Sequence, residues 1–187
     1  VLLLVGGYYF AQNSSWGGKI ISTASAASPW VEVISGKVSL LDENDLLNDL
    51  SAGDEISPGA TIVSDATGQG IIHFPDGSVL RLDKNSKLIL TEAYFNSDNE
   101  SLIVRATLVT GRVWSKVVAL VTPESHWEVK TGNAVATVRG TAFSTEYING
   151  RSRILGSENM VVVQAIDPRT KKIVDRAKVD VKERTIV

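Results

Sequence analysis

From Val31 onward the chain is a series of short segments in which apolar and polar residues alternate, separated by glycine, proline, asparagine and aspartate. A period of two residues is that of a β-strand with one buried face, whereas an amphipathic helix has a period near 3.6. Turn residues that recur about every ten positions are typical of all-β domains. The sequence therefore predicts an all-β fold. The clearest inward-facing set is Leu102, Val104, Ala106 and Leu108.

Three segments make this prediction specific. Phe74 and Leu80 lie on the same face of a predicted hairpin whose turn is Pro75–Ser78, since proline sets φ and glycine supplies a positive φ. Leu40–Leu50, which reads LLDENDLLNDL, is the one stretch with helix-compatible spacing, and it can equally be a polar hairpin loop. Val113–Val121 is apolar on both parities, which predicts a strand covered on both faces.

The alternation changes phase within Val129–Tyr147. Apolar residues share one face up to Val138, and the pattern resumes on the opposite parity at Phe143. The intervening Arg139-Gly140-Thr141 predicts a β-bulge, because one extra residue re-phases a strand and glycine tolerates the backbone that this requires. A reactive loop or a ligand-binding loop is the alternative, but the structural interpretation needs no ligand.

Composition excludes several classes of function. Lysine and arginine total 19 and aspartate and glutamate 21, so the net charge of −2 does not favour a nucleic-acid partner. There is no cysteine, which excludes disulfides and thiolate chemistry. The two histidines, His73 and His126, lack metal-ligand spacing, so no catalytic residue, metal site or cofactor is expected. Trp114 and Trp127 are predicted to pack in the core or at its rim, so glycan contact is not expected.

The first residues are apolar and end in aromatic side chains, but they are shorter than the about 20 residues that a membrane helix needs. They are interpreted as the outer end of a membrane anchor, as the remnant of a processed signal, or as a segment that packs into its own or a neighbouring subunit. The residues assigned to this anchor or assembly role are Val1, Leu2, Leu3, Leu4, Val5, Tyr8, Tyr9 and Phe10.

These patterns predict that the chain is divided into four parts. Residues 1–12 form the apolar segment, and residues 13–30 a linker rich in serine and alanine. Residues 31–150 form the β domain, and residues 151–187 supply C-terminal strands that extend the same domain.

The ordered motifs resemble those of the FecR domain family. The resemblance covers about Val33 to Tyr147, and its most specific part is Val-Arg-Gly-Thr-x-Phe. Gly132 stands where the family usually has proline. The matching motif residues are Gly53, Asp54, Asp76, Gly77, Ser78, Gly111, Val138, Arg139, Gly140, Thr141 and Phe143.

The resemblance implies that these residues define the fold, and that no catalytic set carries over. It also implies a domain that follows a membrane helix and contacts other proteins outside the cytoplasm, commonly in envelope signalling. No cytoplasmic anti-sigma segment is present in the sequence, so regulation of a sigma factor is not expected.

We therefore expect two packed sheets wound as a β-roll or short β-solenoid, in the periplasm or at the cell surface, either membrane-anchored or secreted. The expected function is non-catalytic contact with a protein partner. The alternative is a self-assembling subunit of an extracellular filament or surface layer, which docks its apolar N-terminal segment in a neighbour.

Overall fold

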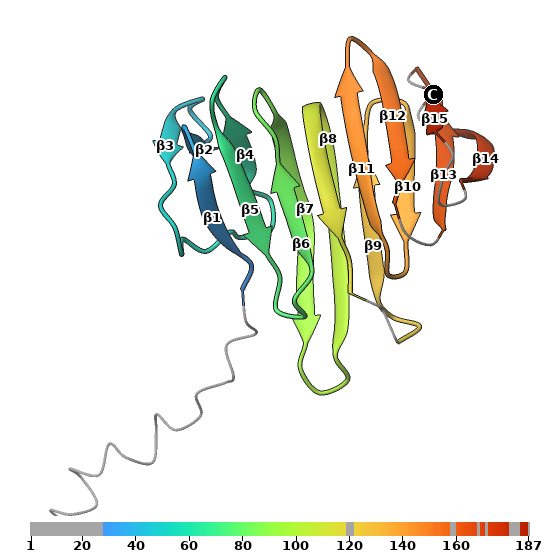
Figure 1. Cartoon of the computed structure of the whole chain (residues 1–187), viewed down its shortest axis with the longest axis horizontal. Coiled ribbons are helices and arrows are strands. Elements are labelled where there is room, and N and C mark those ends of the chain that lie inside the picture. Colours follow the sequence, from blue (N-terminus) through green and yellow to red (C-terminus); the bar gives the residue numbers. More distant parts are fainter. Residues whose placement is uncertain are drawn as a thin grey trace, which may run out of the picture.

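The computed structural model describes residues 28–118, 122–157, 160–167, 169–170, 172–179 and 184–186. Over these ranges the chain forms fifteen β-strands and no helix (Figure 1), so the predicted all-β class is confirmed. In the same ranges no helix is long and apolar enough to cross a membrane. The predictions for residues 1–12, and for the linker up to residue 27, lie outside the described residues.

The strands lie in two layers that share one long strand, β8 (Ser101–Lys116). Layer A contains, in spatial order, β1 (Trp30–Ser35), β5 (Gln69–His73), β6 (Val79–Leu82), β8, β11 (Ala142–Ile148), β12 (Arg151–Gly156) and β15 (Arg184–Ile186). Layer B contains β3 (Leu47–Asp49), β2 (Val38–Leu41), β4 (Thr61–Ser64), β7 (Lys87–Asn96), β8, β9 (His126–Lys130), β10 (Ala134–Val138), β13 (Val161–Ile166) and β14 (Ile173–Val179). Neighbours are antiparallel except β8 and β9, which are parallel.

Strand β8 passes from one layer to the other at a glycine. Up to Thr110 it pairs with β7 in layer B, and from Gly111 onward it pairs with β11 and β6 in layer A. Gly111 has a φ of +95°, a left-handed conformation that residues with a Cβ rarely adopt. The two layers are therefore joined by a sharp change of direction inside a single strand.

One hydrophobic core lies between the layers. The inward-facing leucines of β6 and β8 are buried, as their parity predicted. Trp127 of β9 is fully buried and packs edge-on against Phe74, with the ring centroids 4.9 Å apart. This contact joins layer B to the end of β5 in layer A. The expected winding as a roll or short solenoid stays a prediction.

The predicted β-bulge at Arg139–Thr141 is wrong. Strand β10 ends at Val138 and pairs with β9 and β13 in layer B, whereas β11 begins at Ala142 and pairs with β8 and β12 in layer A. The three residues between them are therefore a crossover between layers. Both arrangements invert the parity of the buried residues, because each inserts non-strand backbone between two alternating segments. The glycine requirement holds, since Gly140 has a φ of +108°.

The structure also decides two other predictions, for Leu40–Leu50 and for Val113–Val121. Leu40–Leu50 is not a helix but contains the end of β2, a turn and β3, which pair as an antiparallel hairpin. Strand β8 ends at Lys116, and only one face of its last part is buried: Val113 is inaccessible, whereas Trp114 and Val118 are exposed. The prediction that Val113–Val121 is covered on both faces is therefore wrong for its described part.

The C-terminal strands pair with the strands before them. Strand β12 pairs with β11, β13 with β10, and β14 with β13 at the edge of layer B. The division of the chain at residues 30 and 150 stays a prediction.

Candidate functional site

The family-motif residues lie at separate places in the fold, and their contacts are structural. The Gly53–Asp54 loop covers the free edge of β1: Val31 N donates to Asp54 O at 2.9 Å, and Gly53 N donates to Val31 O at 2.8 Å. The Asp54 carboxylate accepts from the N–H of Ser51 at 2.8 Å. These hydrogen bonds close a backbone loop at the edge of β1.

The Asp76–Ser78 turn has the same character. Both carboxylate oxygens of Asp76 are occupied by Ser78, one by its N–H at 2.8 Å and one by its hydroxyl at 2.7 Å. The buried hydroxyl oxygen of Ser78 in turn accepts from Val118 N at 2.9 Å. Gly77 supplies the positive φ of the turn. The turn therefore fixes the chain just beyond the end of β8.

The crossover at Arg139–Thr141 lies beside the same end of β8. Thr141 O accepts from Val117 N at 2.9 Å, and the threonine side chain is buried. Arg139 is exposed, and its guanidinium makes one long hydrogen bond of 3.5 Å to Pro123 O. Phe143, the last residue of this motif, is fully buried. The arginine is thus the one side chain of the motif that faces solvent.

Neither histidine belongs to a catalytic or metal cluster. His73 Nε2 lies 2.8 Å from a Glu32 carboxylate oxygen, and its ring stacks on Trp30 with centroids 4.0 Å apart. His126 Nε2 lies 3.2 Å from Glu128. Across the described residues, no group of three or more histidine, aspartate or glutamate side chains is placed to hold a metal ion.

The best candidate for a functional surface is the outer face of layer A, which the motifs did not predict. Trp114 has 37% of its surface exposed there, while its neighbours in β8, Val113 and Ser115, point into the core. The tryptophan lies in an open hollow of about 480 Å³. The other lining residues are Gln69, Ile71, Val79, Arg81, Asp83 and Arg112.

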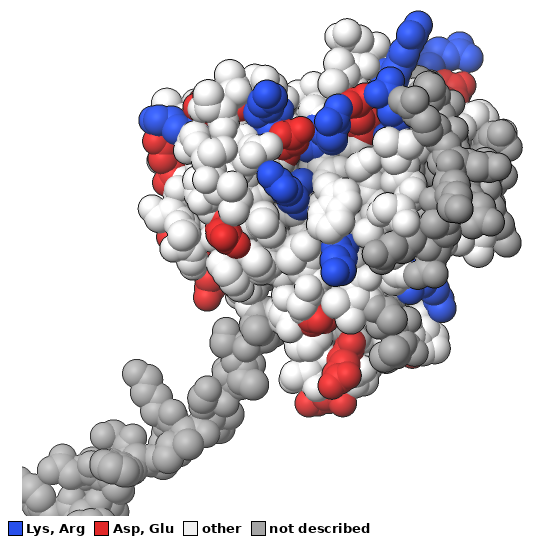
Figure 2. Space-filling view, viewed as in Figure 1, with Lys and Arg blue, Asp and Glu red and all other residues white. Residues whose placement is uncertain are grey.

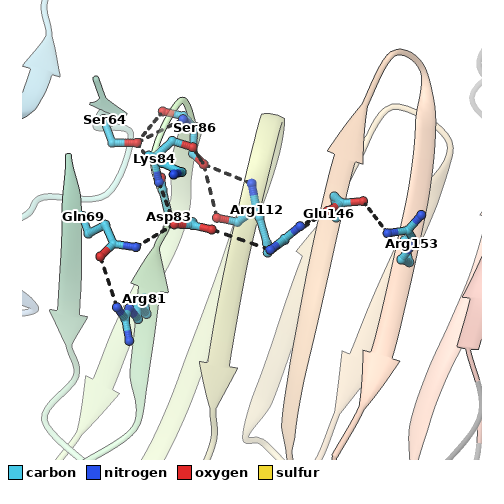
Figure 3. Close-up of polar contacts among 9 residues, drawn as sticks. All are labelled: Ser64, Gln69, Arg81, Asp83, Lys84, Ser86, Arg112, Glu146 and Arg153. Carbon is cyan, nitrogen blue, oxygen red and sulfur yellow. Dashed lines mark hydrogen bonds and ion pairs between the residues drawn. The ribbon is translucent and has the colours of Figure 1, made fainter. Parts of the chain in front are cut away.

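A chain of polar contacts crosses this face over five strands (Figure 3). It starts with Arg81 Nη2, which donates to Gln69 Oε1 at 3.3 Å. The Gln69 amide donates to Asp83 Oδ1 at 2.7 Å, and Asp83 Oδ2 lies 3.7 Å from Arg112 Nη1. The contacts therefore link residues that are more than 40 positions apart in the sequence.

The second half of the chain centres on one carboxylate. Glu146, directly opposite Arg112 in the register of β11 and β8, accepts from Arg112 Nε at 3.0 Å and pairs with Arg153 Nη1 at 3.2 Å. Its side chain is only 14% exposed, so the carboxylate is largely enclosed by the two guanidinium groups. Ion pairs of this kind orient both arginines on the face.

The hydrogen bonds also set the charge states of the network. The bond from Arg112 to Glu146 raises the pKa of the arginine further above its usual value, so its charge is permanent. Partial burial of Asp83 opposes ionisation. This effect is outweighed by hydrogen bonds from the Gln69 amide and Lys84 N and by the charge of Arg112, so the pKa of Asp83 lies below its usual 3.8.

Acidification should therefore weaken the fold through Asp83. The folded state holds this carboxylate ionised, so the unfolded state takes up its proton at higher pH. The stability that Asp83 contributes should be present above pH 3.8 and lost as the pH falls through the lower pKa of the folded state. Urea denaturation between pH 7 and about pH 2 should give a flatter pH dependence for Asp83→Asn than for the native chain.

The control is Asp98→Asn, because no hydrogen bond or ion pair joins the Asp98 carboxylate to another described residue, so its removal should leave the slope unchanged. An equal slope for the native chain and Asp83→Asn would contradict the assignment.

Sequence reasoning missed this surface for an identifiable reason. Arg112, Glu146 and Arg153 each occupy an outward parity of an alternating strand, which is a signal of exposure. Their association depends on strand order, which the pattern does not contain. Trp127 packs in the core as predicted, whereas Trp114 faces the hollow.

Comparisons with known proteins give one family and one solved fold. The model of the family described as FecR protein matches residues 60–162. No curated protein matches the chain. Two crystal structures of a proposed anti-sigma factor from Parabacteroides distasonis ATCC 8503 are similar, with TM-scores of 0.46 and 0.47 and 18% sequence identity. Each alignment covers 68% of this chain, which spans 58% of the length of that protein.

Proposed function

Since the chain belongs to the FecR protein family, we propose that it is an extracytoplasmic domain that acts by contacting another protein, in signalling or organisation of the cell envelope. The family is non-catalytic, and the domain is not an enzyme. The location outside the cytoplasm is supported by the apolar sequence at residues 1–12, which suits a membrane anchor or an assembly segment.

The observation that carries the proposal is the exposed tryptophan in the hollow of layer A. Tryptophan and arginine are the residue types most enriched among the side chains that dominate binding energy at protein interfaces. Trp114 lies between Arg81, its direct neighbour on β6, and Arg112, two positions earlier on β8. Its aromatic side chain lines the hollow and is carried by strand β8 rather than by a loop. A partner can therefore bury it without reordering the backbone.

The winding of the domain fits the same role. A roll or short solenoid is part of this proposal, and it is supported by the chain's several passages between layers A and B from β1 to β15. We assign the contact to layer A because the tryptophan and the hollow are there.

Site-specific photo-crosslinking in the native host tests the contact. A benzophenone amino acid that replaces Trp114 in the full-length protein should give a covalent adduct with a second protein. The matched control replaces Val109, which is on the same strand and 40% exposed but lies in layer B. We expect adducts from position 114 and not from position 109. Equal yields, or none at position 114, would contradict the proposed contact face.

The alternative function, a self-assembling surface subunit, is favoured by a different observation. Layer B ends in two edge strands, β3 and β14, which carry or adjoin exposed apolar side chains. Unpaired strand edges readily pair with another chain. The apolar side chains are Leu46, Leu47, Ile173 and Val174. A benzophenone amino acid at Leu47 of β3 should then give adducts of twice the mass of the chain, because the partner would be a second copy.

A further inference from the structure

The hollows on the outer face of layer A are lined by more cations than carboxylates, although the chain as a whole has a net charge of −2. Two more hollows adjoin the one around Trp114: the first shares Asp83 and Arg112 with it, and the second shares Ile148 with the first. In Figure 2 lysine and arginine side chains cross the upper part of this face, with acidic side chains between them. Together the three hollows are lined by two carboxylates, Asp83 and Glu146, and by five cations, Arg81, Lys84, Arg112, Arg151 and Arg153.

The two carboxylates are already engaged within the domain. Glu146 is held between Arg112 and Arg153, and Asp83 by Gln69 and Arg112. By contrast, no carboxylate of the described residues forms an ion pair with Arg81 or Arg151, nor with Lys116, which lies on the same face opposite Val79. The face thus offers cations that are free to bind an anionic group.

These arginines form a strip of defined length. The arginine strip consists of Arg81 on β6, Arg112 on β8, and Arg151 and Arg153 on β12. Strands β6, β8, β11 and β12 are successive neighbours, so the strip crosses three inter-strand steps, or about 14 Å. An extended polypeptide covers that distance with about four residues.

The floor beside the strip is apolar. Trp114, Ile71 and Val79 line the same hollow as Arg81, and all three point outward on their strands. A ligand that lies along the strip therefore meets an aromatic ring and aliphatic side chains as well as guanidinium groups.

We propose that the arginine strip binds an acidic segment of the partner polypeptide, about four to six residues long, with an apolar side chain placed against Trp114. The inference rests on the proposed function and adds the chemistry of the partner. Acidic side chains complement the guanidinium groups of Arg81 and Arg151, which form no ion pair within the described residues, and this complementarity steers association and sets the orientation of the partner. A polypeptide is favoured over a polyanionic glycan because Ile71, Val79 and Trp114 beside the strip offer a packing place for an apolar side chain, which a row of sulfates or phosphates does not carry.

Fluorescence anisotropy with a labelled synthetic peptide tests the proposal. The probe is an octapeptide in which one residue near the middle is phenylalanine and the other seven alternate between aspartate and glutamate. It is added to the full chain at low salt. Arg81→Glu should weaken binding about tenfold or more, because it replaces attraction with repulsion at the first strip position. Trp114→Ala should also weaken it, whereas a peptide with lysine in place of the acidic residues should not bind.

The matched control is Lys130→Glu, which makes the same change of charge at an exposed position of β9 in layer B. It should alter the affinity less than twofold, and circular dichroism should show all variants folded. Equal losses from Arg81→Glu and Lys130→Glu would overturn the proposal, since binding would then follow net charge. Tighter, Arg81-dependent binding of a heparin oligosaccharide would overturn it in favour of a glycan.

The two proposals fail in different ways. If the acidic peptide does not bind but crosslinking at position 114 still gives a partner adduct, the protein-contact function stands and the acidic chemistry is wrong. If position 114 gives no adduct and the peptide does not bind, both are wrong.

Discussion

Gly111→Ala should lower the free energy of unfolding by about 4 kcal/mol, from left-handed strain and overpacking of about 1–3 kcal/mol each. The φ of this residue is +95°. A Cβ placed there would lie 2.2 Å from Ser86 Oγ and 2.6 Å from Ser86 Cα. Ser86 cannot easily retreat, because its hydroxyl accepts from Arg112 N at 3.0 Å and its N–H donates to Ser64 Oγ at 3.0 Å (Figure 3). Urea denaturation monitored by tryptophan fluorescence measures the loss.

Gly53→Ala separates the two causes. Gly53 has nearly the same φ, +93°, but a Cβ there would meet no atom within 4 Å. Gly53→Ala should therefore lower the free energy of unfolding only through backbone strain, by about 1–3 kcal/mol. If the two substitutions cost the same, the close approach of Ser86 contributes nothing, and the explanation of Gly111 by packing is wrong.

Gly140→Val should also be strongly destabilising, by about 3 kcal/mol. The crossover holds Gly140 at a φ of +108°, a region that a β-branched residue avoids. Val138 and Ala142, two positions before and after Gly140, are buried in different layers, so the strained backbone has little room to relax. Differential scanning calorimetry should show a lower melting temperature, with the same cooperative transition.

Arg139→Ala is the comparison for this site. The exposed guanidinium makes one long hydrogen bond, to Pro123 O, so its removal should change stability by less than about 0.5 kcal/mol. The test is whether Gly140→Val destabilises the protein more than Arg139→Ala does. A neutral Gly140→Val together with an Arg139→Ala that keeps its stability but no longer binds its partner would make Arg139–Thr141 a recognition loop.

The class of the fold and much of the core could be read from the sequence, because both depend on local periodicity. The buried face of β8 up to Leu108, the hairpin turn at Asp76–Ser78 and the burial of Phe143 each follow from a two-residue alternation or from a turn residue. Two glycines of the family motif, Gly111 and Gly140, have a positive φ.

The pairing partners of each strand could not be predicted from the sequence, since hydrogen bonds between strands join residues that are far apart in the chain. The phase change at Gly140 was correctly located but assigned to a bulge, because a bulge and a crossover between layers leave the same local pattern. Likewise, apolar residues on both parities of β8 gave no sign that its outer face is open, because coverage depends on what lies above the strand.

The candidate surface shows the same division most clearly. The outward parity of Arg112, Glu146 and Arg153 follows from the alternation of their three strands, although the sequence did not single these residues out. Only the tertiary structure brought those strands side by side and enclosed one carboxylate between two guanidinium groups. Alternation is set by the geometry of a single extended backbone, whereas the order of strands in a layer is set by the burial of the whole core between the two layers.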